Sequence, residues 1–157
     1  MSRTDRALET FAKSRLGGWY FIRVAPKIDV PLLKASKGRF SANVGTQVCL
    51  LETTGAKSGQ VRLNPLVYVK DGDRVVLTAS KAGATKHPAW FHNLKANPDV
   101  RVALEGRWLD ARARVTEGEE RGRLWAEVND YYAGYDTYQG RAGARVIPVV
   151  VLEPKAG

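Results

Sequence analysis

The sequence predicts a mainly β protein of the α+β class, in which about six antiparallel strands form a small barrel with helices on its outside. Two observations carry this prediction. Short apolar segments follow one another through tight turns, without the long helical crossovers that parallel strands need. The 157 residues, of which 44% are hydrophobic and 26% charged, suit a single globular core.

The N-terminal part differs in composition from the rest of the chain. We expect a helical, basic and aromatic segment at residues 1–40, followed by the barrel domain at residues 41–157. Six of the nine net positive charges lie in the first 50 residues. Apolar residues between Leu8 and Trp19 recur at helical spacing, with an interruption at Gly17-Gly18, and a second short helix is expected from Leu32 to Gly38.

Strands are expected wherever alternating or continuous apolar residues lie between turn residues. The predicted strands are Val48–Thr53, Arg62–Lys70, Arg74–Ala79, Val100–Leu104, Trp108–Val115 and Val146–Leu152. Asp71-Gly72 and Gly106 provide the hairpin turns between successive strands. Pro65 lacks a backbone N–H, which predicts that its strand has an edge or a bulge at that position.

Two helices are expected outside the barrel. Pro88 suits the first position of a helix that ends before Asn97-Pro98. Thr116 and Glu119 have the spacing of a capping box, which predicts a helix that continues through Val128. A polar segment with four tyrosines, residues 131–138, follows this helix.

Several classes of protein do not fit the sequence. The N-terminus carries charges where a signal peptide needs an apolar core, and no apolar run approaches the roughly 18 residues of a spanning helix, so we expect a cytoplasmic protein. The single cysteine, Cys49, lies in an apolar run and is expected to be buried filler. Two histidines without nearby cysteine or carboxylate partners predict no metal site.

Common motifs for nucleotides and nucleophiles are also missing. A P-loop needs glycine where Leu51 and Ala56 stand, and a helix where a strand is expected here. The sequence has neither a G-x-S-x-G elbow nor a G-x-G-x-x-G fingerprint. No nucleic-acid motif appears, and most of the excess charge precedes the motif region, so we expect no nucleic-acid partner.

Two basic, Gly-containing loops predict a site for an anionic ligand. The first loop, residues 54–60, joins two strands and contains Lys57. The second loop, residues 79–86, contains Lys81 and leads into the helix that begins near Pro88. Backbone N–H groups, cations and a helix N-terminus can hold a phosphate or a carboxylate together. The alternative is a pair of solvated basic loops.

The tyrosines of residues 131–138 have two interpretations. Their rings can stack on a planar ligand and their hydroxyls can donate hydrogen bonds to it. Alternatively, two of them pack on the barrel and two lie at the surface. Both interpretations can hold for different tyrosines.

Taken together, these features resemble the deazaflavin-dependent nitroreductase family of actinobacteria, on the branch of the nitroimidazole-activating and quinone-reducing enzymes. The resemblance covers roughly residues 20–154 in the order of the family. The motifs that carry it are Leu51–Arg62, Asn64-Pro65-Leu66, Ala79-Ser80-Lys81, Pro88-Ala89-Trp90, Asn93–Pro98, the tyrosine segment and Ile147–Val150.

The resemblance implies a split β-barrel, FMN-binding-like, that binds coenzyme F-420, an 8-hydroxy-5-deazaflavin with a phosphate and a polyglutamate tail. By the same resemblance, the cofactor-binding residues are Ala56, Lys57, Ser58, Arg62, Leu63, Asn64, Pro65, Thr78, Ala79, Ser80, Lys81, Ala89, Trp90, Phe91, His92, Asn93 and Tyr135. Many members carry arginine where Ala56 stands here, so we expect one contact to the tail to be missing.

The resemblance also implies the reaction. Reduced deazaflavin donates a hydride, and the expected acceptor is a small electron-poor molecule: a quinone, an activated enone or lactone, or a nitroaromatic. The catalytic candidates are Ser80, Tyr132, Tyr135 and Tyr138, whose hydroxyls would stabilise the charge added to the acceptor. The nearest alternative is an FMN-dependent reductase on the same fold, and a non-enzymatic module that binds nucleic acid or an anionic membrane ranks below both.

The aromatic residues 19–22, followed by Arg23, leave three roles open for the N-terminal segment. It can cover one end of the core, form a lid over the acceptor site, or make peripheral contact with a membrane. The sequence fits either a monomer or a homodimer.

Overall fold

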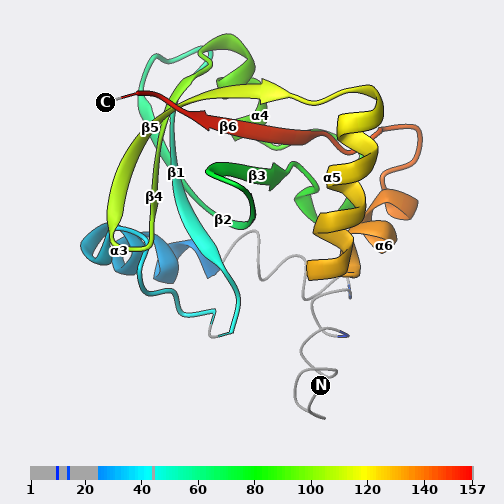
Figure 1. Cartoon of the computed structure of the whole chain (residues 1–157), viewed down its shortest axis with the longest axis horizontal. Coiled ribbons are helices and arrows are strands. Elements are labelled where there is room, and N and C mark those ends of the chain that lie inside the picture. The colour runs from blue at the N-terminus through cyan, green and yellow to red at the C-terminus, as the bar shows by residue number, and fades with distance from the viewer. Residues whose placement is uncertain (1–9, 11–13, 15–24, 44, 157) are drawn as a thin grey trace.

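The computed structural model describes residues 10, 14, 25–43 and 45–156 of the chain. The elements, shown in Figure 1, are α3 (Ala25–Ser36), β1 (Val48–Thr54), β2 (Val61–Asp71), β3 (Arg74–Thr78), the 3-10 turn η1 (Lys81–Gly83), α4 (Ala89–Ala96), β4 (Asp99–Leu104), β5 (Arg107–Val115), α5 (Gly118–Tyr131), α6 (Gly134–Arg141) and β6 (Val149–Pro154). The predicted helix at residues 8–19 and the aromatic cluster at residues 19–22 lie almost entirely outside the described residues.

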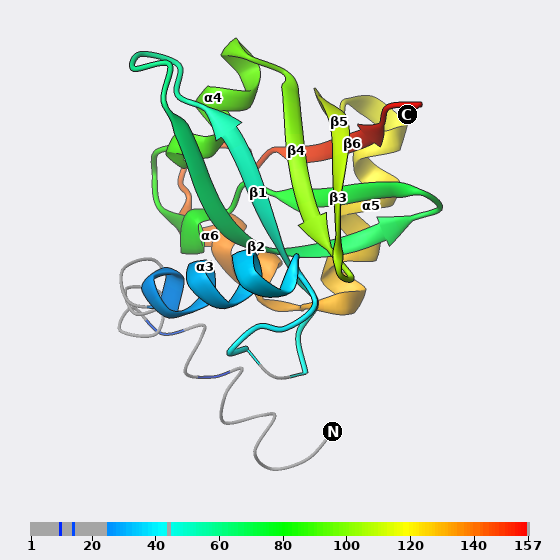
Figure 2. The same cartoon turned by 90° about the vertical axis from the view of Figure 1, so that its left-hand side faces the viewer.

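The strands form a closed antiparallel barrel in the order β1-β2-β3-β6-β5-β4, which confirms the predicted fold class. The pairs β2-β3 and β4-β5 are the hairpins that the turn residues predicted, and β1-β2 is a third hairpin, joined by the first loop. Figure 2 shows α3 along the outside of β1 and β2, and Figure 1 shows α5 and α6 on the opposite side. None of the helices in the described part of the chain has the length and apolarity that a bilayer crossing requires.

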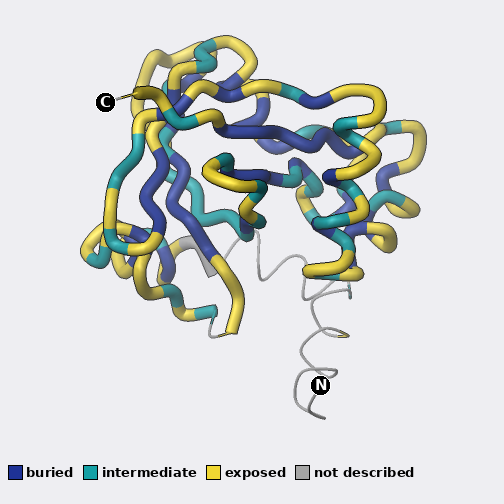
Figure 3. Tube along the Cα trace, viewed as in Figure 1, coloured by how far each residue is buried: buried dark blue, intermediate teal, exposed yellow. Residues whose placement is uncertain are grey.

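Figure 3 shows that much of the length of the strands is buried. Alternation along the strands divides these residues between the barrel interior and the layers under the helices. In β1, Cys49 and Leu51 belong to the interior cluster, whereas Val48 and Leu50 pack under α3 with Leu33. Burial raises the pKa of the Cys49 thiol to about 12, in agreement with its predicted role as filler.

Pro65 lies where the sequence predicted a sheet edge. In β2, Pro65 pairs with Leu50 of β1, while the pairing with β3 covers only Tyr68 to Asp71. The side of β2 that faces away from β1 is therefore a local edge over its first residues, where a missing N–H has no effect on the ladder.

Three predicted element boundaries were wrong. Helix α3 begins at Ala25 and contains Pro31, because burial of Leu33 against the barrel offsets the lost helical hydrogen bond. The last strand begins at Val149, because the N–H of Ile147 donates to Gln139 Oε1 at 2.9 Å, outside the sheet. Pro88 is the N-cap of α4, one residue before the helix proper.

The predicted capping box at Thr116 does not form. Thr116 is buried, and its hydroxyl donates to the carbonyl of Val149 at 2.8 Å, so the side chain joins two strands. Glu117 is the N-cap of α5 and makes no side-chain capping bond. The tyrosine segment, for which no helix was predicted, forms α6 from Gly134 to Arg141.

Candidate functional site

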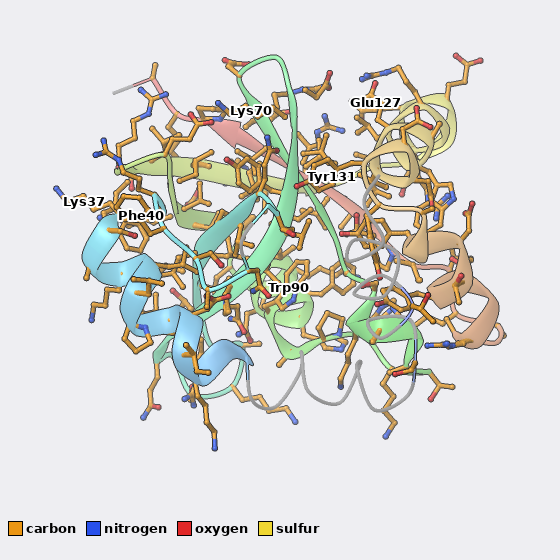
Figure 4. All side chains as sticks on the ribbon, turned by 90° about the horizontal axis from the view of Figure 1, so that it is seen from below. Lys37, Phe40, Lys70, Trp90, Glu127 and Tyr131 are labelled. Carbon is orange, nitrogen blue, oxygen red and sulfur yellow. The ribbon has the colours of Figure 1, made fainter. Side chains whose placement is uncertain are left out.

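A cleft of about 910 Å³ opens between the first loop, the beginning of β2 and helix α4. Its wall consists of Gly55, Ala56, Lys57, Ser58, Val61, Arg62, Leu63, Asn64, Ala89, Trp90, His92 and Asn93. Ten of these twelve residues are among the predicted cofactor-binding residues. In the view from below in Figure 4, Trp90 lies near the centre of the molecule.

The first loop is closed by its own backbone. The N–H of Gly55 donates to the carbonyl of Gln60 at 2.7 Å, and the N–H of Gly59 donates to the carbonyl of Gly55 at 3.0 Å. A Cβ at position 55 would lie 2.5 Å from Ser58 Oγ, so a larger residue there would displace the Ser58 side chain. The closed loop leaves Lys57 exposed at the edge of the cleft.

A buried amide joins the first loop to α4. Asn93 Oδ1 accepts the N–H of Ala56 at 3.0 Å, and Asn93 Nδ2 donates to Thr53 Oγ1 at 3.2 Å. Both Asn93 and Thr53 are buried. These bonds hold the two walls of the cleft at a fixed separation, a role for Asn93 that the sequence alone did not reveal.

The cleft has the charge of an anion site. Lys57 and Arg62 are exposed on its wall, and within the described part of the chain neither forms an ion pair. The first residues of α4, Ala89 and Trp90, line the opposite wall, and the helix N-terminus has no side-chain cap. Unpaired cations and an uncapped helix N-terminus together favour a phosphate or carboxylate group.

The second loop lies beside the cleft rather than on its wall. Gly83, at φ +79°, approaches α6 so closely that a Cβ would lie 2.7 Å from the carbonyl oxygen of Tyr138. Arg145 holds the carbonyls of Ala79 and Ser80 from the segment before β6. Among the described residues, the predicted residues that do not line the cleft are Pro65, Thr78, Ala79, Ser80, Lys81, Phe91, Tyr132, Tyr135 and Tyr138.

His87, just before α4, also contacts Arg145. Its Nδ1 lies 3.0 Å from Arg145 Nη1, and its ring packs against that of Phe91 with 4.7 Å between centroids. Burial, and then the positive charges of Arg145, His92 and Lys95, lower the pKa of His87. No pattern in the sequence indicated this contact between His87 and Arg145.

The tyrosines form a packed cluster on α6 and at the end of α5. The rings of Tyr132 and Tyr135 meet edge to face at 5.3 Å, and the hydroxyls of Tyr132 and Tyr138 lie 3.2 Å apart. Tyr135 and Tyr138 are buried, Tyr132 is half-buried and Tyr131 is exposed. The first interpretation, contact with a ligand, therefore remains open chiefly for Tyr132.

Burial raises the pKa of Tyr135, whose hydroxyl shares a hydrogen bond with the Thr78 side chain at the end of β3. This bond ties α6 to the strand that leads into the second loop. The cleft, α4, the second loop and the tyrosine cluster are thus neighbours, each in contact with the next.

Comparison with known proteins places this chain in a family. The profile of a family described as F420H(2)-dependent quinone reductase matches residues 25–154. An F420H(2)-dependent quinone reductase of Mycobacterium tuberculosis is 44% identical over 106 residues, which cover 66% of this chain and 70% of the relative. A second relative from the same organism, described as a putative F420H(2)-dependent quinone reductase, is 38% identical over 106 residues, which cover 68% of this chain and 88% of the relative.

Solved structures agree in fold. A structure described as an F420-H2 dependent reductase superposes with a TM-score of 0.63 at 43% identity and covers 68% of this chain and 93% of its own. Another, described as a domain-swapped dimer, gives a TM-score of 0.64 at 36% identity and covers 79% and 94% of the two chains. The haem protein HutZ of Vibrio cholerae, at 15% identity and a TM-score of 0.55 over 81% of this chain and 90% of its own, shares the barrel fold alone.

Proposed function

Because this chain belongs to the F420H(2)-dependent quinone reductase family, we propose that it transfers a hydride from reduced coenzyme F-420 to a quinone or a comparable electron-poor acceptor. The observation that carries the proposal is the cleft, in which Lys57 and Arg62 lie on one wall and the uncapped N-terminus of α4 on the other. A second cavity, of about 160 Å³, has Asp73 on its wall beside Lys70 and Arg107, so its charges are of both signs.

The chemistry of the cleft fits an anionic cofactor. Lys57, Arg62 and the first N–H groups of α4 would hold the phosphate and glutamate groups of the tail. Leu63 and Trp90 offer apolar surface in the same cleft for a planar ring. Ala56 uses its N–H on Asn93 and has no charged side chain, so the tail would lack a contact at this position.

When bound, the reduced cofactor would supply the hydride, and the chain would orient the acceptor, exclude water and stabilise the charge that develops on it. We assign the last role to Ser80 and Tyr132. The half-buried Tyr132 hydroxyl lies 3.2 Å from that of Tyr138, so the two hydroxyls can hydrogen-bond to each other with either one as the donor. Tyr135 would act through packing and through Thr78.

Titration of the purified protein with F-420, and in parallel with FMN, tests the proposal. Trp90 on the cleft wall should report binding through quenching of its fluorescence, and Trp90→Phe should remove most of that signal. Tight F-420 binding, weak FMN binding and oxidation of reduced F-420 by quinones are expected. Preference for FMN would move the enzyme to flavin chemistry, and binding of neither would contradict the site.

We also infer a peripheral contact between this protein and an anionic membrane, through the outer face of α3. Ile28, Leu32 and Lys34 are exposed on α3. Lys37 and Phe40, also exposed, follow the helix and lie at the same end of it in Figure 4. Apolar side chains interleaved with cations favour the interface of an anionic bilayer, in which lipid-soluble quinones dissolve. Sedimentation with anionic vesicles should fall for Ile28→Ser/Leu32→Ser, and an unchanged bound fraction would contradict the inference.

The oligomeric state also enters as a proposal. A domain-swapped dimer among the solved relatives, at 36% identity, supports a homodimer for this chain. Light scattering during gel filtration distinguishes the homodimer from a monomer.

A further inference from the structure

Arg145 makes four contacts with the segment that connects β3 to α4. Its guanidinium donates to the carbonyl oxygens of Ala84, Ala79 and Ser80 at 2.9, 3.0 and 2.7 Å, and Nη1 lies 3.0 Å from His87 Nδ1. The planar fork of arginine can serve several acceptors at once, which the point charge of lysine cannot do with the same geometry. Arg145 is half-buried, so these bonds are partly shielded from water.

The backbone around Arg145 is itself fixed by α6. Gln139 Nε2 donates to the Arg145 carbonyl at 2.8 Å, and Gln139 Oε1 accepts the N–H of Ile147 at 2.9 Å. Ile147 is fully buried. Arg145 therefore projects from a segment that hydrogen bonds attach to α6, and the same residue is bonded to the second loop.

The contact with Arg145 determines the tautomer of His87. An arginine side chain in a protein is protonated and has no acceptor atom, so Nη1 must donate and His87 Nδ1 must accept. The neutral ring then carries its proton on Nε2. The charged groups that face His87 are Arg145 on one side and His92 and Lys95 of α4 on the other, and all of them oppose protonation.

We propose that Arg145 is a positioning residue of the reductase site: it fixes the loop that carries Ser80 and holds His87 as a neutral Nε2–H donor beside His92. The catalytic part of this proposal rests on the proposed function, whereas the contacts of Arg145 with the second loop and His87 rest on geometry alone. His92 lines the cleft, and its ring centroid lies 5.9 Å from that of His87. A fixed neutral tautomer of His87 would present an N–H donor without adding a charge beside the cleft.

The first test reads the imidazole nitrogens directly. The chain contains only two histidines, so a ¹⁵N-histidine sample of the wild-type protein gives two sets of ring signals, which His87→Gln assigns. We expect His87 to have an unprotonated Nδ1, a protonated Nε2 and a pKa below its ordinary value. A wild-type His87 that is protonated on Nδ1 would overturn the proposal, and this result needs no arginine variant to fold.

The second test compares Arg145→Gln and Arg145→Lys with Arg107→Gln, which removes an equal charge from an exposed residue at the β4-β5 turn. In Arg145→Gln the tautomer preference should weaken, the pKa of His87 should rise, and kcat should fall about tenfold while F-420 affinity changes little. The kcat of Arg145→Lys should lie between those of Arg145→Gln and the wild type, and Arg107→Gln should resemble the wild type. An unchanged kcat and His87 signal in Arg145→Gln would overturn the role. Failure of the wild-type protein to bind F-420 would contradict only the proposed function, because the ring signals are read without cofactor.

Discussion

The side chain of Asn93, in the middle of α4, accepts the backbone N–H of Ala56, in the first loop, at 3.0 Å. The two residues are far apart in sequence, and their bond joins the opposite walls of the cleft. The remaining half of the amide donates to Thr53, so both polar ends of Asn93 are satisfied inside the protein. The width of the cleft therefore depends on one buried side chain rather than on the ligand.

Asn93→Ala should lower the free energy of unfolding by about 1–3 kcal/mol, because the N–H of Ala56 and the hydroxyl of Thr53 lose a buried partner. F-420 affinity should also fall, since the first loop loses its attachment to α4. Urea denaturation measures the first effect and fluorescence titration the second.

Asn97→Ala is the matched control, because its amide reaches the carbonyl of Thr54 only at 3.4 Å, a marginal hydrogen bond. We expect it to lose much less stability and no cofactor affinity. Equal losses in the two variants would contradict the role of Asn93 as the link between the walls.

Lys57→Gln and Arg62→Gln should each weaken F-420 binding by about tenfold, because each removes a cation from the cleft wall without creating a cavity. Stability should hardly change, since both side chains are exposed. The affinity of the wild type should fall as salt is added, and both variants should show a shallower salt dependence. Lys155→Gln, far along the chain at the end of β6, tests whether net charge alone matters.

The hairpin order of the barrel was predictable because alternation and turn residues act locally. Asp71-Gly72 and Gly106 specify tight turns between apolar segments, whereas closure of the barrel depends on the long-range pairs β1-β4, β3-β6 and β5-β6. The proximity of the first loop and α4 was predictable in part, because the second basic loop leads directly into this helix and both loops were expected to form one anion site. The predicted ends of the helices were less accurate, because the environments of Leu33 and Thr116 depend on contacts with residues distant in sequence.

The residues that the sequence did not reveal act through side-chain bonds over long separations. Arg145 precedes an apolar strand and looks like one of many surface cations, yet it binds a loop more than fifty residues earlier in the chain. The resemblance assigned Asn93 to the cofactor, and its side-chain amide also makes hydrogen bonds to Ala56 and Thr53 within the chain. Neither role has a local pattern, since only the folded barrel brings the partners together.

Tyr132→Phe should reduce the rate of acceptor reduction while F-420 affinity stays nearly intact. The change removes the hydroxyl that lies 3.2 Å from Tyr138 but keeps the ring that packs on Tyr135. Stopped-flow oxidation of the reduced cofactor measures the rate, and fluorescence titration measures the affinity. Equal loss of both would contradict the assigned role.

Tyr135→Phe provides the contrast within the same cluster. Its hydroxyl bonds to Thr78 in a buried position, so its removal should cost about 1 kcal/mol of stability. If Tyr135 acts only through packing, the catalytic rate should change less than in Tyr132→Phe. A larger rate loss in Tyr135→Phe would transfer the catalytic role to that residue.

A network of ion pairs on the far side of the barrel gives the protein a predictable response to acid. Both oxygens of Glu120, in the first turn of α5, accept hydrogen bonds from Arg114 of β5 at 2.6 and 3.2 Å, and Arg74 of β3 adds another at 3.2 Å. These bonds, those from Arg114 first, lower the pKa of Glu120 from an ordinary 4.5 to about 2. The carboxylate thereby ties the helix to two strands.

Glu120→Gln should therefore lower the melting temperature near neutral pH and make little difference in strong acid. A carboxyl group whose pKa is lower in the folded state stabilises that state above its unfolded pKa, and this contribution is lost as the pH falls from about 4.5 toward about 2. The difference between wild type and variant should close over that interval. Glu117→Gln, at the exposed N-cap of the same helix and without an ion pair in the described part of the chain, should show no such convergence. A difference that stays constant with pH would mean that Glu120 stabilises α5 by its shape and not by its charge.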